Sequence, residues 1–94
     1  MSFSHLDRYP GGELIRQGLD HLAQGRDSEA AFLVLIGAPR LRRLGFKVRE
    51  SQGLPPEHML YALLSSLDPN SAHSRYNALI RRLVSFERAV ECAG

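Results

Sequence analysis

The sequence predicts an all-α fold, a small single-domain bundle of four main helices plus a short basic helical turn. Apolar residues recur at helical spacing along the last third of the chain. Prolines, glycines and aspartates stand where helices would begin and end. A chain of 94 residues with 44% apolar side chains suits one compact domain, residues 1–94. The alternative is an α+β fold with short strands near 31–36 and 46–49.

The N-terminal quarter predicts an irregular lead-in followed by a helix. Residues 1–12 form the lead-in, because they end in a proline and two flexible glycines. The first main helix should begin near Glu13 and end at Gly25, which is well placed as a C-terminal cap. Gly18 falls on its apolar face, where a missing side chain would let another helix approach closely.

The next segment, from Asp27 to Ala38, is apolar on every side. Such a pattern is typical of a fully buried element, and periodicity alone does not distinguish a central helix from a buried strand. The start of the segment favours a helix, because Asp27 or Ser28 can cap it and alanines follow.

Positive charge is concentrated in the short basic turn that Pro39 begins and Gly45 ends. The net charge is only +2, yet residues 30–49 contain five bases and no acid. These bases are Arg40, Arg42, Arg43, Lys47 and Arg49. Arginine suits bidentate contacts with phosphates or carboxylates, although a GC-rich genome would produce the same preference for arginine over lysine.

The C-terminal half predicts a helical hairpin. One helix should begin at Pro56, after a loop at 50–54. A long terminal helix should run from Asp68 to about Glu91, with Asp68 as its N-cap and Pro69 in its first turn. Because so few residues separate the two helices, they should pack as neighbours.

The long terminal helix has two different faces. Its apolar face comprises Ala72, Tyr76, Leu79, Ile80, Leu83, Phe86 and Val90. Its opposite face is rich in serine, alanine and arginine, which allows close helix packing and ion pairs with a partner. The predicted protein interface on this face comprises Ser71, Ser74, Ala78, Arg81, Arg82, Ser85 and Ala89. We expect a symmetric dimer through it, because a chain this short has a thin core of its own.

One acidic residue, Glu87, stands on the apolar side of the same helix. A buried carboxylate needs a partner. We therefore expect an ion pair between Glu87 and an arginine of the basic segment, residues 39–49.

Nucleic-acid binding is the alternative function. The arginines that could contact a nucleic-acid backbone are Arg40, Arg42, Arg43, Arg75, Arg81 and Arg82. The hairpin is similar to a helix-turn-helix, and the polar N-terminal end of the long helix suits an anion. Against this alternative, residues 50–94 carry five acids and four bases.

The sequence contains one weak motif that indicates catalysis. Arg16 and His21 stand at the R-x4-H spacing that resembles the motif of small helical HEPN-type ribonucleases, and that resemblance implies action on RNA phosphates. Five positions on a helix correspond to about 140° of rotation, so the two side chains converge only if the helix is distorted or a second subunit contributes. We therefore predict a protein with no catalysis of its own.

The remaining residues predict no metal and no cofactor, because the histidines and the single Cys92 are scattered without ligand spacing. One cysteine cannot form an internal disulfide, and the longest apolar run is too short for a membrane span. These features predict a cytoplasmic, soluble protein that acts through protein contacts, as a homodimer or as a subunit of a larger assembly.

Overall fold

The computed structural model describes residues 4–48 and 53–93. Its elements are the 3-10 helix η1 (Ser4–Arg8) and the helices α1 (Gly12–Ala23), α2 (Glu29–Ile36), α3 (Ala38–Arg43), α4 (Pro56–Leu67) and α5 (Ala72–Ala93). The described residues contain no strand, so the all-α prediction is confirmed and the α+β alternative is wrong.

The N-terminal lead-in is more ordered than the sequence predicted. Residues Ser4–Arg8 form η1, and Leu6 is fully buried in the core. Tyr9 lies next to Phe86 of α5, with 6.0 Å between ring centroids. The prediction of an irregular segment was wrong because it rested on the glycines at 11 and 12. It did not take into account the apolar side chains of Leu6 and Tyr9, which precede them and pack onto the core.

Helix α1 packs closely against α2 through the glycine that the sequence singled out. A Cβ atom at Gly18 would collide with the backbone oxygen of Ala30 and the side chain of Val34. Ile15, Leu19 and Leu22 complete the buried face of α1. The predicted close approach at Gly18 is therefore confirmed.

Helix α2 is the central element, and this explains its continuous apolar run. It contacts α1, α3, α4 and α5, so side chains in every direction from its axis are buried. Ser28 is its N-cap, because its hydroxyl oxygen accepts a hydrogen bond of 3.0 Å from the amide of Ala31. The residues named as the first alternative strand, 31–36, are thus helical.

The short basic turn is a helix, α3, as predicted. After α3, Phe46 donates its amide to the backbone oxygen of Leu41, which turns the chain back toward the helix. The side chain of Arg42 donates to the backbone oxygen of Val48 at 2.6 Å. The second alternative strand is absent over 46–48, and Arg49 lies outside the described residues.

The terminal hairpin is present, but its turn differs from the prediction. Asp68 ends α4, and α5 begins only at Ala72, so residues 68–71 form the turn. The Asp68 carboxylate accepts hydrogen bonds from the amide of Asn70 (3.1 Å) and the hydroxyl of Ser71 (2.9 Å). The prediction of Asp68 as the N-cap of the long helix is wrong, because its side chain bonds the donors of its own turn.

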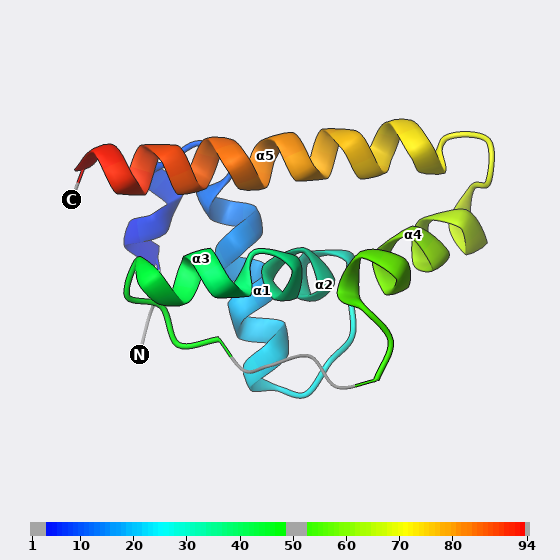
Figure 1. The fold of residues 1–94 in the computed structure, drawn as a ribbon, viewed down its shortest axis with the longest axis horizontal. Coiled ribbons are helices and arrows are strands. Elements are labelled where there is room, and N and C mark those ends of the chain that lie inside the picture. The colour runs from blue at the N-terminus through cyan, green and yellow to red at the C-terminus, as the bar shows by residue number, and fades with distance from the viewer. Residues whose placement is uncertain (1–3, 49–52, 94) are drawn as a thin grey trace.

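Figure 1 shows how these elements are arranged. Helix α5 runs along the whole length of the molecule, with α3, α2 and α4 on the viewer's side below it and α1 behind them. The molecule measures 38 × 24 × 20 Å. Helix α5 has 22 residues, about 33 Å at the ordinary rise, so it spans most of the long axis.

Candidate interaction surface

The predicted serine-, alanine- and arginine-rich face of α5 is exposed, with two exceptions. Ser74, Ala78, Arg81, Arg82 and Ser85 are all exposed. Ala89 is half-buried, and Ser71 lies outside the helix in the turn before it. The structure therefore keeps most of the predicted face together and removes Ser71 from it.

One edge of this face is partly covered by the chain itself. Gly11, with φ of 73°, lies so close to Arg82 that a Cβ atom there would be 2.8 Å from the Arg82 backbone oxygen. The segment before α1 therefore borders the face along Arg82. The other predicted residues within α5 that are exposed are Ser74, Ala78, Arg81 and Ser85.

The six arginines proposed for nucleic-acid binding do not share one role. Arg40 pairs with Glu87 and Glu91, and Arg75 pairs with Glu29 at 3.0 Å. Arg42 is half-buried and bonds the chain at Val48. Arg43, Arg81 and Arg82 are exposed, and they have no ion pair within the described residues.

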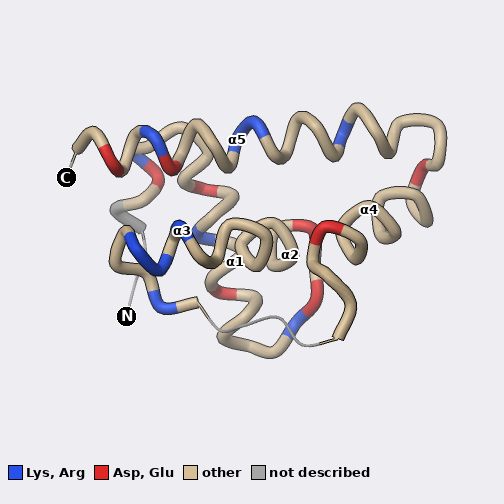
Figure 2. Tube along the Cα trace, viewed as in Figure 1, with Lys and Arg blue, Asp and Glu red and all other residues tan. Residues whose placement is uncertain are grey.

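The six arginines also divide between two helices, three on α3 and three along α5 (Figure 2). Arg40, Arg42 and Arg75 are held by protein groups, whereas Arg43, Arg81 and Arg82 are exposed and have no ion pair within the described residues. The predicted cationic surface is therefore smaller than the sequence indicated.

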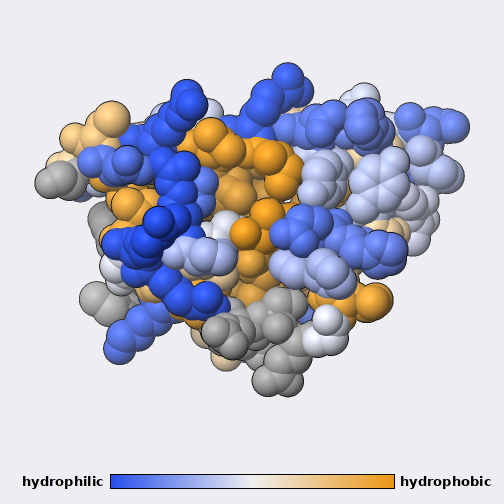
Figure 3. Space-filling model, in the orientation of Figure 1, coloured by the Kyte–Doolittle hydropathy of each residue, from blue (hydrophilic) through white to orange (hydrophobic). Residues whose placement is uncertain are grey.

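A groove between α3 and α5 is a surface feature that the sequence did not predict. We call it the α3–α5 groove, a depression of about 300 Å³ lined by Ile36, Gly37, Pro39, Arg40, Arg43, Ile80, Leu83, Val84 and Glu87. Figure 3 shows apolar side chains gathered in the middle of this face, with strongly hydrophilic ones beside them over α3. Ile36, Ile80 and Val84 are only half-buried, so apolar surface remains open to solvent.

The groove exists because a glycine lets α5 come close to the junction of α2 and α3. A Cβ atom at Gly37 would be 2.9 Å from Cδ1 of Leu83 and 3.1 Å from Oε2 of Glu87. Helical spacing then places Ile80 and Val84 beside Leu83 and Glu87 on the open side. The sequence analysis put Ile80 on the apolar face and assigned Val84 to neither face. Their spacing of four residues indicates only that the two share one side of the helix, and not that a groove lies there.

One end of the groove is rich in charge. A Glu87 carboxylate oxygen lies 3.8 Å from the guanidinium of Arg40, and Glu87 is 5% exposed. Glu91 accepts a hydrogen bond from the same arginine. Arg40, Arg43, Leu44 and Glu91 line a second depression that continues the groove at this end. The predicted ion pair of Glu87 with an arginine of the basic segment is confirmed.

The environment of the two glutamates shifts their acidity in opposite directions. Burial raises the pKa of Glu87, and the charge of Arg40 opposes this only in part. The hydrogen bond from Arg40, followed by its charge, lowers the pKa of Glu91. Weaker contributions from Arg43 and Arg88 act in the same direction on Glu91, so three arginines gather around this end.

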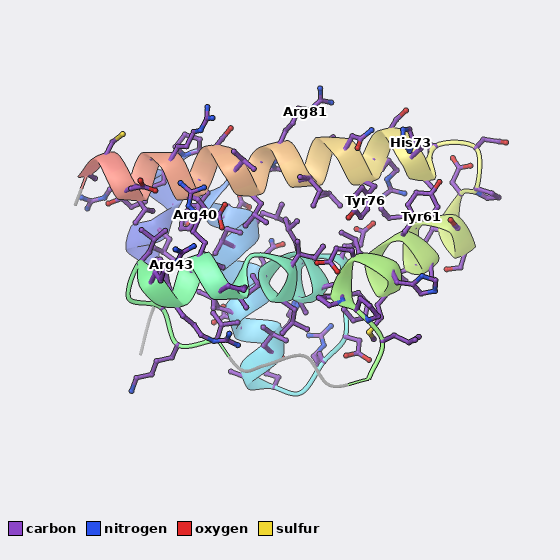
Figure 4. All side chains as sticks on the ribbon, viewed as in Figure 1. Arg40, Arg43, Tyr61, His73, Tyr76 and Arg81 are labelled. Atoms are coloured by element: carbon purple, nitrogen blue, oxygen red, sulfur yellow. The ribbon has the colours of Figure 1, made fainter. Side chains whose placement is uncertain are left out.

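The other end of the same face is aromatic and acidic. Tyr61 of α4 and Tyr76 of α5 meet edge to face, with 5.8 Å between ring centroids, and Figure 4 shows them far from Arg40 and Arg43. Burial, and then the negative charge of Glu57, raises the pKa of Tyr76. Glu57 is exposed in the first turn of α4. The face therefore has two arginines and two glutamates at one end, an apolar middle, and two tyrosines with Glu57 at the other end.

Each residue of the ribonuclease-like pair makes a structural contact with a different part of the chain. The Nε atom of Arg16 donates to Asp7 of η1 at 2.9 Å. The Nδ1 atom of His21 lies 2.7 Å from the hydroxyl of Ser28, the cap of α2. Arg16 and His21 therefore interact with different elements, and nothing in this arrangement directs both at one phosphate.

Within the described ranges, no group of three metal-ligating side chains is present, and no helix is both long and apolar enough to cross a membrane. Comparison with models of known protein families, with curated proteins and with solved structures finds no match for this chain. The site must therefore be interpreted from its own geometry.

Proposed function

We propose that this chain is a small helical protein that acts through protein–protein contacts, as a homodimer or as a subunit of a larger assembly, and that it has no catalysis of its own. The observation that carries the proposal is the exposure of α5. Only four of its 22 residues are buried, namely Ala72, Leu83, Phe86 and Glu87. A helix that leaves so much of its surface open along the whole molecule suits contact with a partner.

The apolar groove beside α5 supports the same proposal. A domain of this size buries only about 60–65% of the surface of its unfolded chain, so covering more apolar surface would stabilise it appreciably. Ile36, Ile80 and Val84 are available for this purpose, and Arg43 and Arg81 border them with exposed charges. A half-buried apolar strip with a charged rim is the usual arrangement of a protein interface.

We further propose that the protein works in the cytoplasm. The support is its cysteine usage, since Cys92 is the only cysteine and is an exposed free thiol.

The alternative function, nucleic-acid binding, has less support. It retains the exposed Arg43, Arg81 and Arg82. It loses much of the cationic surface on which it depended, because Arg40, Arg42 and Arg75 are engaged with protein groups. A phosphate-binding surface needs several free cations on one side, and each contributes to a salt-dependent affinity.

The experiment is a measurement of solution mass by light scattering on a sizing column, at low and at high salt, with nucleic-acid absorbance read from the same peak. A dimer that persists at high salt and carries no nucleic acid supports the proposal. A monomer that binds RNA or DNA at low salt and releases it at high salt would overturn it in favour of the alternative. Arg82→Glu would then abolish that binding with the mass unchanged. A monomer without nucleic acid would count against the homodimer and against the alternative, and would leave only the subunit of a larger assembly.

A further inference from the structure

The broad face of the molecule carries an arrangement that is complementary to itself. We propose that the α3–α5 groove is a homodimer interface, in which a second copy of this chain lies across the groove on a two-fold axis. Arg43 of each copy then lies near Glu57 of the other. This inference rests on the proposed function and names the surface and the partner.

Charged, apolar and aromatic side chains follow one another along this face. Arg40 and Arg43 stand at one end of the face, and Tyr61 and Tyr76 at the other (Figure 4). Ile80 and Val84 line the groove with the two arginines and follow Tyr76 along α5. Glu57 is close enough to the tyrosine end for its charge to raise the pKa of Tyr76. On α5, the distance from Tyr76 to Glu91 is about 22 Å at the rise of an α-helix. Arg43, at the end of the strip that also holds Glu91, is therefore well separated from Glu57 at the tyrosine end.

A two-fold axis through the middle of such a strip brings unlike ends together. In an isologous dimer, residue i contacts residue j of the partner, and residue j contacts residue i. The apolar middle then faces its own copy, which buries Ile80 and Val84. The Arg43 end of each copy faces the Glu57 end of the other, so two Arg43–Glu57 pairs form at the rim.

The charges at the Arg43 end favour an acid from outside the chain. Arg40 is already shared by Glu87 and Glu91, whereas Arg43 is exposed and has no ion pair within the described residues. Glu57 is likewise exposed and unpaired within that part of the chain. A uniformly acidic partner would suit Arg43 but would be repelled at Glu57, so a second copy matches both ends better.

The face is large enough for a stable contact. It is seen along the shortest axis in Figure 1 and measures 38 × 24 Å. An interface of standard size buries about 800 Å² on each partner. The total accessible surface of the chain is 5855 Å², so the contact would cover about one seventh of it.

The test is a charge exchange within the homodimer, read as the dimer dissociation constant by sedimentation. We expect Arg43→Glu and Glu57→Arg each to raise that constant about tenfold or more, since each places like charges opposite each other twice. The double variant Arg43→Glu/Glu57→Arg should return it to within about threefold of the wild type, because both pairs are restored with reversed sign. Single variants without effect, or a double variant no better than the single ones, would overturn the inference.

A second pair of variants tests the middle of the groove and separates it from the neighbouring face of α5. We expect Val84→Asp to give a monomer, whereas Ser85→Asp, one position along the helix, should leave the dimer intact. Circular dichroism confirms that each variant is folded. A dimer lost in Ser85→Asp and Ala78→Arg but kept in Val84→Asp overturns the groove and leaves the proposed function standing. A wild type that stays monomeric overturns the groove homodimer and leaves, of the proposed function, only the subunit of a larger assembly.

Discussion

Arg40 on α3 and Glu87 on α5 form the ion pair that joins these two helices, with 3.8 Å between guanidinium nitrogen and carboxylate oxygen. The two side chains differ in environment, because the side chain of Arg40 is 38% exposed and the side chain of Glu87, taken without its backbone, only 6%. Arg40 also binds Glu91, so one solvated cation serves two carboxylates. The Glu87 carboxylate is therefore largely removed from solvent, and it shares its arginine partner with Glu91.

The first prediction concerns Glu87→Gln. Because burial raises the pKa of Glu87 above its ordinary value of 4.5, the folded state favours the protonated carboxyl. This contribution to stability is present below pH 4.5 and is lost as the pH rises through the raised pKa. We expect Glu87→Gln to raise the free energy of unfolding at neutral pH by up to about 1 kcal/mol, because no stranded charge remains. Urea unfolding between about pH 4 and pH 7 measures the gain, which should grow with pH.

The matched control is Glu91→Gln, which changes the other carboxylate on the same arginine. The hydrogen bond from Arg40 lowers the pKa of Glu91, so its contribution is present above pH 4.5 and is lost as the pH falls through the lowered value. Glu91→Gln should therefore remove a contribution to stability that increases with pH, whereas Glu87→Gln removes one that decreases with pH. Two variants that change the slope in the same direction would contradict this account.

The ion pair of Glu87 with an arginine could be predicted from the sequence, because helical spacing alone puts this carboxylate on an apolar face. The same reasoning anticipated the central position of α2 and the close approach at Gly18. Each of these depends on one periodic element and on the rule that buried polar groups need partners.

The turn at Asp68 and the α3–α5 groove could not be predicted in this way. Asp68 can accept from the amides of a following helix or from its own turn, and local sequence suits both outcomes. The groove depends on how far Gly37 lets α5 approach, which is a distance between elements. Spacing along one helix cannot give that distance, so Val84 was left without a role.

The second prediction is that Gly18→Ala destabilises the protein. Alanine favours an isolated helix over glycine by up to about 1 kcal/mol. Here the added methyl group would collide with the backbone oxygen of Ala30, so α1 and α2 must separate. We expect a net loss of about 1–3 kcal/mol in the free energy of unfolding. The neighbouring exposed change Gln17→Ala should alter it by no more than about 0.5 kcal/mol, and a stabilised Gly18→Ala variant would contradict the close packing.

The third prediction is that Phe86→Ala is among the most damaging single changes. Phe86 is completely buried, and its ring contacts Tyr9 and Phe46, which come from segments far away in sequence. Truncation leaves a cavity at that junction, with an expected loss of about 3–5 kcal/mol in the free energy of unfolding. Denaturant titration checks this value, with Val84→Ala as the control. Because Val84 is half-buried in the groove, its truncation should cost no more than about 1 kcal/mol.

The last prediction distinguishes a structural role of His21 from a catalytic one. The Ser28 hydroxyl caps α2 through the amide of Ala31 and also lies 2.7 Å from Nδ1 of His21. We expect Ser28→Ala to lower the free energy of unfolding by about 1 kcal/mol, as for other N-caps. His21→Ala should lower it by less, because the cap itself remains. Thermal and urea unfolding measure both losses, and the same samples can be incubated with several RNAs. An RNA cleavage activity of the wild type that His21→Ala abolishes, while stability stays unchanged, would show that the histidine serves chemistry and not the cap of α2.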